Sequence, residues 1–296
     1  MGQIAATVNA KRSPGAVALP RPHGCSHCGL MRHGATRHGG GSPRRHGRGK
    51  DALAPTVWLW GLHAVAAAVG NPRRRPRRLV ATDEGLAALA RALPGALPLP
   101  PERASAASVA ALLPPGAVHQ GLALAADPLE PPPLDAVLAA TDGPVIVLDQ
   151  VTDPRNVGAI LRSAAAFGAA AVIVQDRHAP GETGAMARAA AGALERVPLI
   201  RAVNLARTLA SLKQAGLWVV GLAADAPTTL AGARLGDRRL ALVLGAEDEG
   251  MRRLTRKACD SLVRLPQTGA VESLNVSVAA AVALYAVMAS RLEEPR

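Results

Sequence analysis

Short, uninterrupted apolar segments alternate with alanine-rich segments from Leu134 to the C-terminus, and this alternation constrains the fold more than any other feature. A strand with one solvated face alternates apolar and polar residues, whereas a continuous Val/Ile run indicates a strand buried on both faces. The apolar runs lie at residues 144–148, 171–175, 197–203, 218–223, 240–245 and 262–266. Predicted helices lie at residues 155–167, 183–194, 205–215, 252–257 and 274–291. The pattern predicts an α/β fold with a parallel sheet covered by helices on both faces.

A smaller unit is expected before this sheet. Its predicted elements are a helix at 57–69, a basic linker at 71–78, a strand at 79–82, a helix at 84–93 and a strand at 118–124. Residues 1–55 are rich in Gly, Pro, His and Arg and show no hydrophobic period, so we expect them to be disordered. The expected organisation is a basic tail at 1–55, the small unit at 56–128, a linker at 129–143 and the parallel-sheet domain at 144–296.

The formal charge of +12 indicates a polyanionic partner, and residues 1–50, which contain no Asp or Glu, carry most of it. This tail either adds nonspecific affinity for such a polyanion or has no function. Cys25 and Cys28 have zinc-like spacing, but they stand alone in a His/Arg-rich tract, which argues against a zinc site. Three cysteines, an odd number, suit a reducing compartment, and no apolar run reaches the roughly 18 residues of a membrane span. Cytoplasm is the expected location, with an organelle transit peptide as a minor alternative.

Ligands of parallel sheets bind at the carboxyl ends of the strands, which directs attention to three loops. In the first, residues 149–158, Asp153 and Pro154 are typical of a helix start, with Asp as N-cap and Pro at the first helical position. This structural interpretation explains neither Asn156 nor Arg162. Six residues of α-helix rotate by about 600°, so Asn156 and Arg162 converge only if Asn156 lies in the loop or the first turn.

The second and third loops also have structural explanations when each is taken alone. Residues 244–250 combine glycines with acidic side chains at a strand end, which is typical of a solvated loop. Residues 265–278 contain Ser273, a good N-cap candidate. Asn275 and Ser277 are harder to explain, because they lie at the start of a strongly apolar helix and buried polar side chains need partners. A bound ligand would supply them.

Together, the order, spacing and residue types of the three loops resemble the SpoU (TrmH-type) branch of the SPOUT methyltransferases, from about residue 144 to the C-terminus. Asn156 and Arg162 match that family's first motif, Glu247 matches the second, and Ser273-Leu274-Asn275-Val276-Ser277 resembles the third. Residues 58–63 and 118–121 resemble the small N-terminal RNA-binding domain of the branch that acts on large-subunit ribosomal RNA.

The resemblance implies an α/β domain with a C-terminal trefoil knot, a homodimer, and S-adenosylmethionine as cofactor. The implied cofactor-binding residues are Leu244, Gly245, Leu265, Ser273 and Leu274. The implied catalytic residues are Asn156, Arg162, Glu247, Ser273 and Asn275. Arg162 would deprotonate or orient the ribose 2′-hydroxyl. Because the pKa of a guanidinium exceeds about 12, arginine is a weak base, and binding of an RNA phosphate is a real alternative for this residue.

Two positions depart from the family pattern, and three other residues are explained by packing or solvent exposure without a functional role. Asp248 stands where the family often has Gly, and Ala191 stands where it often has Ser. Asp tolerates left-handed geometry, so we expect only a local change. We interpret Cys259 as a small packed residue, and Asp225 and Glu182 as solvated surface side chains.

The leading functional hypothesis is a ribosomal-RNA ribose methyltransferase, with 2′-O-methylguanosine in large-subunit RNA as product. A transfer-RNA ribose methyltransferase of the same family is one alternative. A non-catalytic RNA-binding or ribosome-assembly protein is another, although it would not need the whole set Asn156, Arg162, Glu247 and Asn275. A nucleotide-dependent dehydrogenase is disfavoured because no GxGxxG motif follows a strand.

Overall fold

The computed structural model describes residues 56–269 and 273–293, which form two sheets. The larger sheet has six strands, all parallel, in the order β10-β8-β9-β5-β6-β7. The strands are β5 (Val145–Leu148), β6 (Ala171–Gln175), β7 (Leu199–Ala202), β8 (Trp218–Leu222), β9 (Leu240–Leu244) and β10 (Ser261–Val263). The predicted parallel sheet is confirmed.

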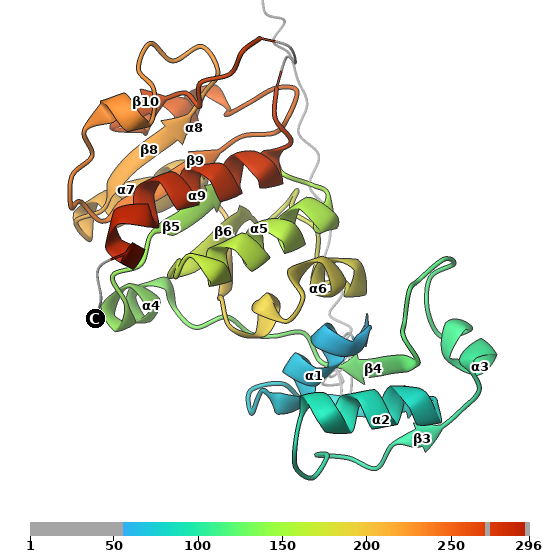
Figure 1. Ribbon diagram of the computed structural model, residues 1–296. Helices are drawn as coiled ribbons and strands as arrows, with labels where there is room; N and C mark the ends of the chain where they lie inside the picture. The colour runs from blue at the N-terminus through green and yellow to red at the C-terminus, as the bar shows by residue number, and fades with distance from the viewer. Residues whose placement is uncertain (1–55, 270–272, 294–296) are drawn as a thin grey trace, which may run out of the picture. The chain divides into compact units, whose positions relative to one another are not determined.

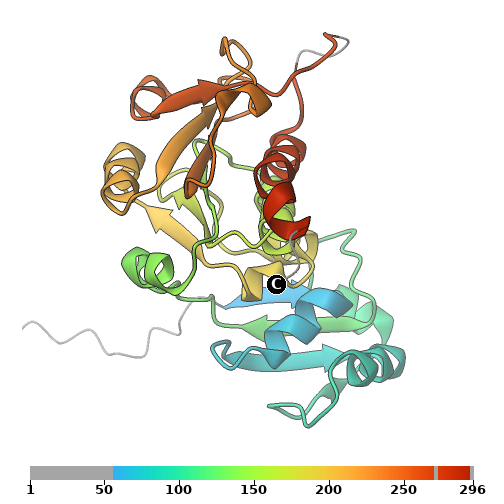
Figure 2. The ribbon, with the colours of Figure 1, turned by 60° about the vertical axis from the view of Figure 1, so that its left-hand side comes forward.

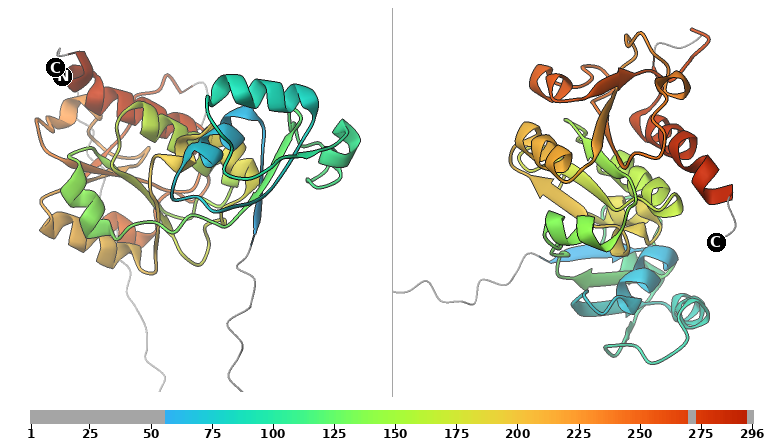
Figure 3. Two further views of the ribbon diagram at one scale, coloured as in Figure 1. Left: turned by 90° about the horizontal axis from the view of Figure 1, so that it is seen from below. Right: turned by 90° about the vertical axis from the view of Figure 1, so that its left-hand side faces the viewer.

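Helices cover both faces of this sheet, as its continuous apolar strands require (Figure 1). One face carries α5 (Pro154–Ala166), α6 (Gly184–Ala190) and α9 (Val276–Glu293), and the other carries α4 (Leu134–Ala140), α7 (Leu205–Gln214) and α8 (Arg253–Lys257). Figure 2 and the right panel of Figure 3 show α4 and α7 on one side of the strands and α9 on the other. Side chains of β5 alternate between the two layers: Ile146 packs in the first core and Val147 in the second.

The smaller sheet has four strands in the order β1-β4-β2-β3, of which β1, β4 and β2 pair antiparallel. The strands are β1 (Val57–Trp60), β2 (Pro76–Ala81), β3 (Glu102–Arg103) and β4 (Leu122–Ala126). The helices that accompany them are α1 (Leu62–Gly70), α2 (Asp83–Ala92) and α3 (Ala106–Ala110). Figure 1 shows α1 and α2 against this sheet. The small α/β unit expected before the parallel sheet therefore contains three more elements, β1, β3 and α3, than its sequence pattern predicted.

Two predicted helices have different limits in the structure. The first four residues of the expected helix at 57–69 form strand β1, because Gly61 adopts φ +84° and separates the strand from α1. The expected helix at 183–194 ends at Ala190, because Ala191 and Gly192 adopt φ +49° and +92°. A 3₁₀ turn, η1 (Ala193–Glu195), follows. Both corrections arise from left-handed backbone, which ends a right-handed helix.

The basic linker and Glu182 are also different from expectation. Arg74 is buried and binds two carboxylates of the parallel-sheet region, Glu182 at 2.5 Å and Glu195. Asn71 Nδ2 also donates a hydrogen bond to Glu195, at 2.6 Å. The interpretation of Glu182 as a solvated side chain was wrong, because only 9% of its side chain is exposed. Burial acts to lower the pKa of Arg74, but hydrogen bonds and charges from Glu195 and Glu182 together raise it, so this arginine stays charged.

Cys259 is partly buried against the core between α8 and β10, and burial raises the pKa of its thiol to about 11, as suits a small packed residue. Within the described residues, no helix is long and apolar enough to cross a membrane. The predicted disorder of residues 1–55 and the Cys25/Cys28 pair lie outside the described residues.

Candidate active site

The first site loop follows β5 and is fixed by a buried carboxylate. Asp149 is fully buried, its backbone N–H donates to Leu244 O at 2.8 Å, and its two carboxylate oxygens accept from Arg252 N at 2.9 Å and Arg252 Nε at 2.7 Å. These bonds tie the loop after β5 to the loop after β9. The sequence contained both residues, but nothing in their local patterns indicated that they meet.

The start of α5 presents Asn156 to the site. Asp153 caps the helix by accepting from Arg155 N at 2.8 Å, and Pro154 occupies the first helical position, as predicted. Asn156 therefore lies in the first turn. Its Nδ2 donates to Glu247 Oε1 at 3.1 Å, and its Oδ1 accepts from Asn275 Nδ2 at 3.1 Å.

Glu247 is the centre of this network. Its Oε1 accepts three hydrogen bonds, from Asn156 Nδ2, from Asn275 Nδ2 at 2.7 Å and from Val276 N at 3.3 Å. Within the described residues, its Oε2 accepts none, and the side chain is exposed. One carboxylate oxygen is thus held by the starts of α5 and α9, while the other has no hydrogen-bond partner among the described residues.

The loop that carries Glu247 turns sharply, and Gly245 makes that turn sterically possible. Ala246 and Gly250 exchange backbone hydrogen bonds of 3.2 and 3.0 Å. A Cβ on Gly245 would lie 2.0 Å from the carbonyl carbon of Gly250. The expected left-handed backbone falls on Gly250, with φ +65°, and not on Asp248. The absence of a side chain at Gly245 therefore makes room for the backbone of its own loop.

Asn275, and not Ser273, caps the last helix. The structured helix begins at Val276, and Asn275 Oδ1 accepts from Ser277 N at 2.9 Å and from Ser277 Oγ at 2.5 Å. The interpretation of Ser273 as N-cap was wrong by two residues. Asn275 caps α9 with its Oδ1 and donates to the carboxylate of Glu247 with its Nδ2. These two roles explain why a polar residue stands at the start of an apolar helix.

A hollow of about 580 Å³ adjoins this network at the carboxyl ends of β8 and β9. It contains all five residues expected to bind a cofactor: Leu244, Gly245, Leu265, Ser273 and Leu274. Glu247 and Asp225 also line it. Asp225 pairs with Arg256 at 2.8 Å, and this hydrogen bond lowers the pKa of Asp225. The Asp225 side chain is 70% exposed, in agreement with its interpretation as a solvated residue.

Arg162 does not join the other predicted site residues within this chain. It lies two turns further along α5, is exposed, and lines a different hollow of about 670 Å³ with His63 and Arg196. The first-turn position of Asn156 met the condition for convergence, but the rotation of the helix still sends the two side chains to different places.

The parallel-sheet region of the chain is similar to known RNA methyltransferases. Residues 143–285 match the SpoU rRNA Methylase family model. Over 182 residues, the chain is 48% identical to the 23S rRNA (guanosine-2′-O-)-methyltransferase RlmB of Vibrio vulnificus, covering 60% of this chain and 73% of that protein. The chain belongs to the SpoU rRNA methylase family. It is a methyltransferase of that family.

Solved structures agree with this assignment. A putative RNA methyltransferase of the TrmH family from Porphyromonas gingivalis is 27% identical, with a TM-score of 0.64 over 79% of this chain and 90% of that one. The SpoU methyltransferase AviRb from Streptomyces viridochromogenes, in complex with the cofactor AdoMet, is 23% identical, with a TM-score of 0.67 over 81% of this chain and 92% of that one. The likeness to AviRb shows the shared fold.

Proposed function

We propose that this SpoU methyltransferase transfers a methyl group from S-adenosylmethionine to the 2′-hydroxyl of a guanosine in 23S-type large-subunit rRNA. The observation that carries this proposal is the convergence of three strand-end loops on Glu247. That arrangement holds one carboxylate oxygen and presents the other beside a hollow. The substrate follows from the names of relatives such as the Vibrio vulnificus enzyme.

The hollow fits S-adenosylmethionine in size and chemistry. Apolar side chains of Leu222, Leu244 and Val276 offer a surface for the adenine ring, and backbone of the strand-end loops offers hydrogen-bonding groups. Glu247, Asp248 and Glu249 supply negative charge toward a cationic ligand, whereas Asp225 is paired with Arg256. When bound, the cofactor supplies an electrophilic methyl group on a sulfonium. The protein must then align and activate a poor nucleophile, the ribose hydroxyl.

Glu247 is suited to that task. Its free Oε2 can accept a hydrogen bond from the ribose 2′-hydroxyl, which points an oxygen lone pair toward the methyl group. Asn156 and Asn275 hold the carboxylate from two sides, so its orientation is fixed before the substrate binds. Ser273 and Leu274, at the edge of the hollow, border the space where the reacting groups would meet. With the cofactor held by the residues around the hollow, its methyl group would pass to the ribose oxygen, and Glu247 Oε2 would take up the hydroxyl proton.

Arg162 belongs to the proposed catalytic set, but it acts from a second copy of the chain. Within one chain it lines a hollow separate from the one beside Glu247. A homodimer supplies another Arg162, which would orient the ribose through an adjacent RNA phosphate, because a guanidinium is a strong phosphate ligand and a weak base.

Helix α9 supports the proposed homodimer. Ala280, Ala283 and Leu284 are buried against the body of the domain, whereas Val278, Val282 and Tyr285 are exposed by 44–57%. The three exposed residues lie at i, i+4 and i+7 and form one apolar stripe. An apolar stripe on a helix of a soluble domain is expected to be covered by a partner, and a second copy would cover it symmetrically.

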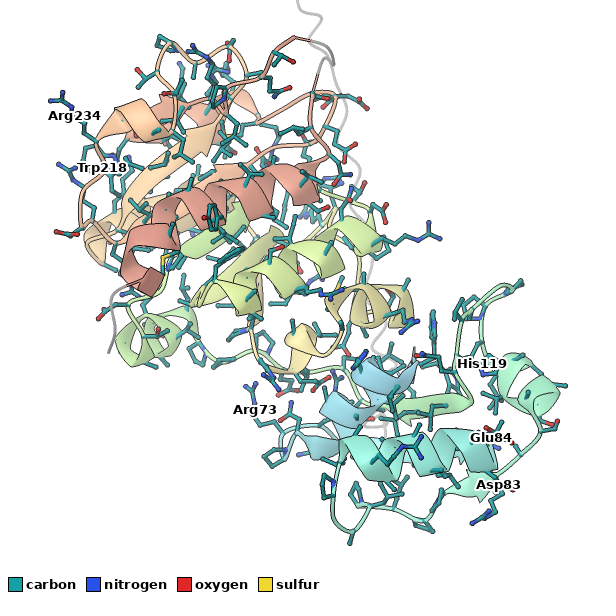
Figure 4. All side chains as sticks on the ribbon, in the orientation of Figure 1. Arg73, Asp83, Glu84, His119, Trp218 and Arg234 are labelled. Carbon is teal, nitrogen blue, oxygen red and sulfur yellow. The ribbon has the colours of Figure 1, made fainter. Side chains whose placement is uncertain are left out.

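Two further parts of the proposal concern the chain path and the RNA. We propose that the parallel-sheet domain has a C-terminal trefoil knot, as the family resemblance implies; the contacts of α9 with both α5 and β9 are compatible with it. We also propose that the small unit binds RNA. Its arginines Arg73 and Arg75 are exposed, and Figure 4 shows Arg73 extending from the ribbon.

The test is methyl transfer from labelled S-adenosylmethionine to unmodified 23S rRNA, with transfer RNA as a parallel substrate. Nuclease digestion then identifies the methylated nucleoside. Glu247→Gln replaces the free acceptor oxygen by a donor, and we expect it to reduce kcat by about 100-fold. Glu249→Gln is the matched control, because Glu249 lines the same hollow outside the network, and we expect an effect below about twofold.

Three outcomes would overturn parts of this proposal. Methylation of transfer RNA in place of 23S rRNA would contradict the substrate. Equal losses in the Glu247 and Glu249 variants would contradict the role of Glu247. A wild-type protein that neither binds the cofactor nor methylates either RNA would favour a non-catalytic RNA-binding protein.

A further inference from the structure

A second hollow, of about 350 Å³, lies at the same carboxyl edge of the parallel sheet but on its other side. It is formed by the end of β6, the turn from β7 into α7, and the start of α8. The loop after β9 separates the two hollows: Gly250 and Met251 line the first, and Arg252 to Thr255 line the second. None of its lining residues belongs to the methyl-transfer network.

The floor of this second hollow contains an unmet hydrogen-bond acceptor. Gln175, the last residue of β6, is 9% exposed, and its Oε1 is buried without a hydrogen-bond partner among the described residues. An unpaired buried amide oxygen is unfavourable by about 1–3 kcal/mol. Gln175 lines the hollow, and a shift of its side chain that carries the whole amide into the hollow would bring this oxygen within reach of a ligand. A ligand that donates an N–H there would satisfy it.

The rim of the hollow attracts an anion. Arg252 is anchored by its Nε to buried Asp149, while Arg253 is exposed and has no ion-pair partner within residues 56–269 and 273–293. Leu205 and Ala206, at the N-terminus of the ten-residue helix α7, also line the hollow, and their end of the helix carries partial positive charge.

Two apolar side chains flank the same opening. Val203 is 77% exposed and Leu254 is 62% exposed, although both are large hydrophobic residues. The acceptor oxygen of Gln175 suits the edge of a base, the guanidinium of Arg253 suits a phosphate, and the apolar side chains of Val203 and Leu254 suit the face of a base.

We propose that this hollow binds a nucleotide of the RNA substrate next to the one that is methylated, with its base edge on Gln175 and its phosphate on Arg253. This inference rests on the proposed function and adds a second contact point on the same RNA. An RNA strand that crosses the carboxyl edge of the sheet passes both hollows. The base has an N–H donor facing Gln175, and guanine, with its N1–H and exocyclic amino group, meets this requirement.

The test compares RNA binding and methyl transfer in Gln175→Leu, Arg253→Ala and Arg234→Ala. Arg234 is the matched control: it is also exposed, but it precedes β9 at the amino edge of the sheet and lies on the side of Trp218 in Figure 4. Leu is close to Gln in volume and has no polar group to leave unpaired, so the first variant is expected to fold. Thermal unfolding of each variant checks this.

We expect Gln175→Leu to raise the Kd for a 23S rRNA fragment about fivefold, the effect of one hydrogen bond. Arg253→Ala should reduce the slope of log Kd against log salt by about one, the effect of one phosphate contact. Both variants should raise KM for RNA and leave unchanged both kcat at saturating RNA and the Kd for S-adenosylmethionine. Arg234→Ala should leave all of these quantities unchanged.

The failure of this inference is distinguishable from failure of the proposed function. If the wild type methylates 23S rRNA and all three variants bind and methylate it equally well, the second hollow is not an RNA site. If Gln175→Leu lowers kcat and leaves KM unchanged, Gln175 acts on the catalytic network and the nucleotide subsite is wrong. If the wild type methylates no RNA, the proposed function itself fails.

Discussion

Residues with positive φ determine where α1 begins and where α6 ends, and the strain at the end of α6 can be measured. Ala191 adopts φ +49° just after α6, a conformation that glycine adopts without strain. We expect Ala191→Gly to stabilise the protein by about 1 kcal/mol. Ala87→Gly, on the exposed face within α2, is the matched control and should destabilise by a similar amount. Urea denaturation measures both changes, and equal signs would show that the backbone at Ala191 is unstrained.

The predicted site residues differ in how well the sequence located them. Asn156, Glu247 and Asn275 meet because each lies in a segment that follows a strand of the parallel sheet, and parallel strands bring these segments to one edge. Arg162 does not meet them, because its position depends on helix rotation and, in our proposal, on a second copy. Glu182 was misread because its partner, Arg74, is 108 residues away, and no local pattern encodes such a pair.

At the level of elements, the buried ion pairs of Arg74 connect the segment between α1 and β2 to two carboxylates of the parallel-sheet region. Glu182 lies just before α6, and Glu195 is the last residue of η1. Removing one member leaves buried carboxylates without a counter-charge, so we expect Arg74→Met to destabilise the protein by about 3 kcal/mol. Arg103→Met is the matched control, because Arg103 and Asp83 form an exposed pair worth below about 1 kcal/mol. Chemical denaturation checks both. Similar losses would contradict the role of burial.

The elements that the sequence predicted well each have one clear local pattern, such as an apolar run or a helix cap. The apolar run of β6 matches its predicted limits, and α5 begins at its predicted cap. Strand β1 was absorbed into a helix because Val57–Trp60 is apolar throughout, and periodicity does not separate a buried strand from a buried helix over so few residues. The two-residue strand β3 pairs only with distant β2, so its own sequence carries no signal.

At the scale of the whole molecule, the proposed dimer determines where Arg162 acts, and mixed dimers can test this. In our proposal each site combines Glu247 of one chain with Arg162 of the other. A dimer of Arg162→Ala with Glu247→Gln then contains one site with both changes and one site with neither. If Arg162 instead acted in the site of its own chain, each of the two sites in the mixed dimer would carry one of the two substitutions.

We therefore expect two variants that are each inactive to recover about one quarter of wild-type activity when co-expressed in equal amounts, since half of randomly formed dimers are mixed and each has one intact site. Methyl transfer to 23S rRNA is the measurement. Adding Val282→Arg to both chains places charge in the apolar stripe of α9 and should abolish the recovery, with a halved mass in light scattering. Val118→Arg, at an exposed valine outside α9, should leave the mass unchanged. Light scattering checks that the mixed dimers are intact. If such dimers recover no activity, Arg162 acts in the site of its own chain or has no role in catalysis.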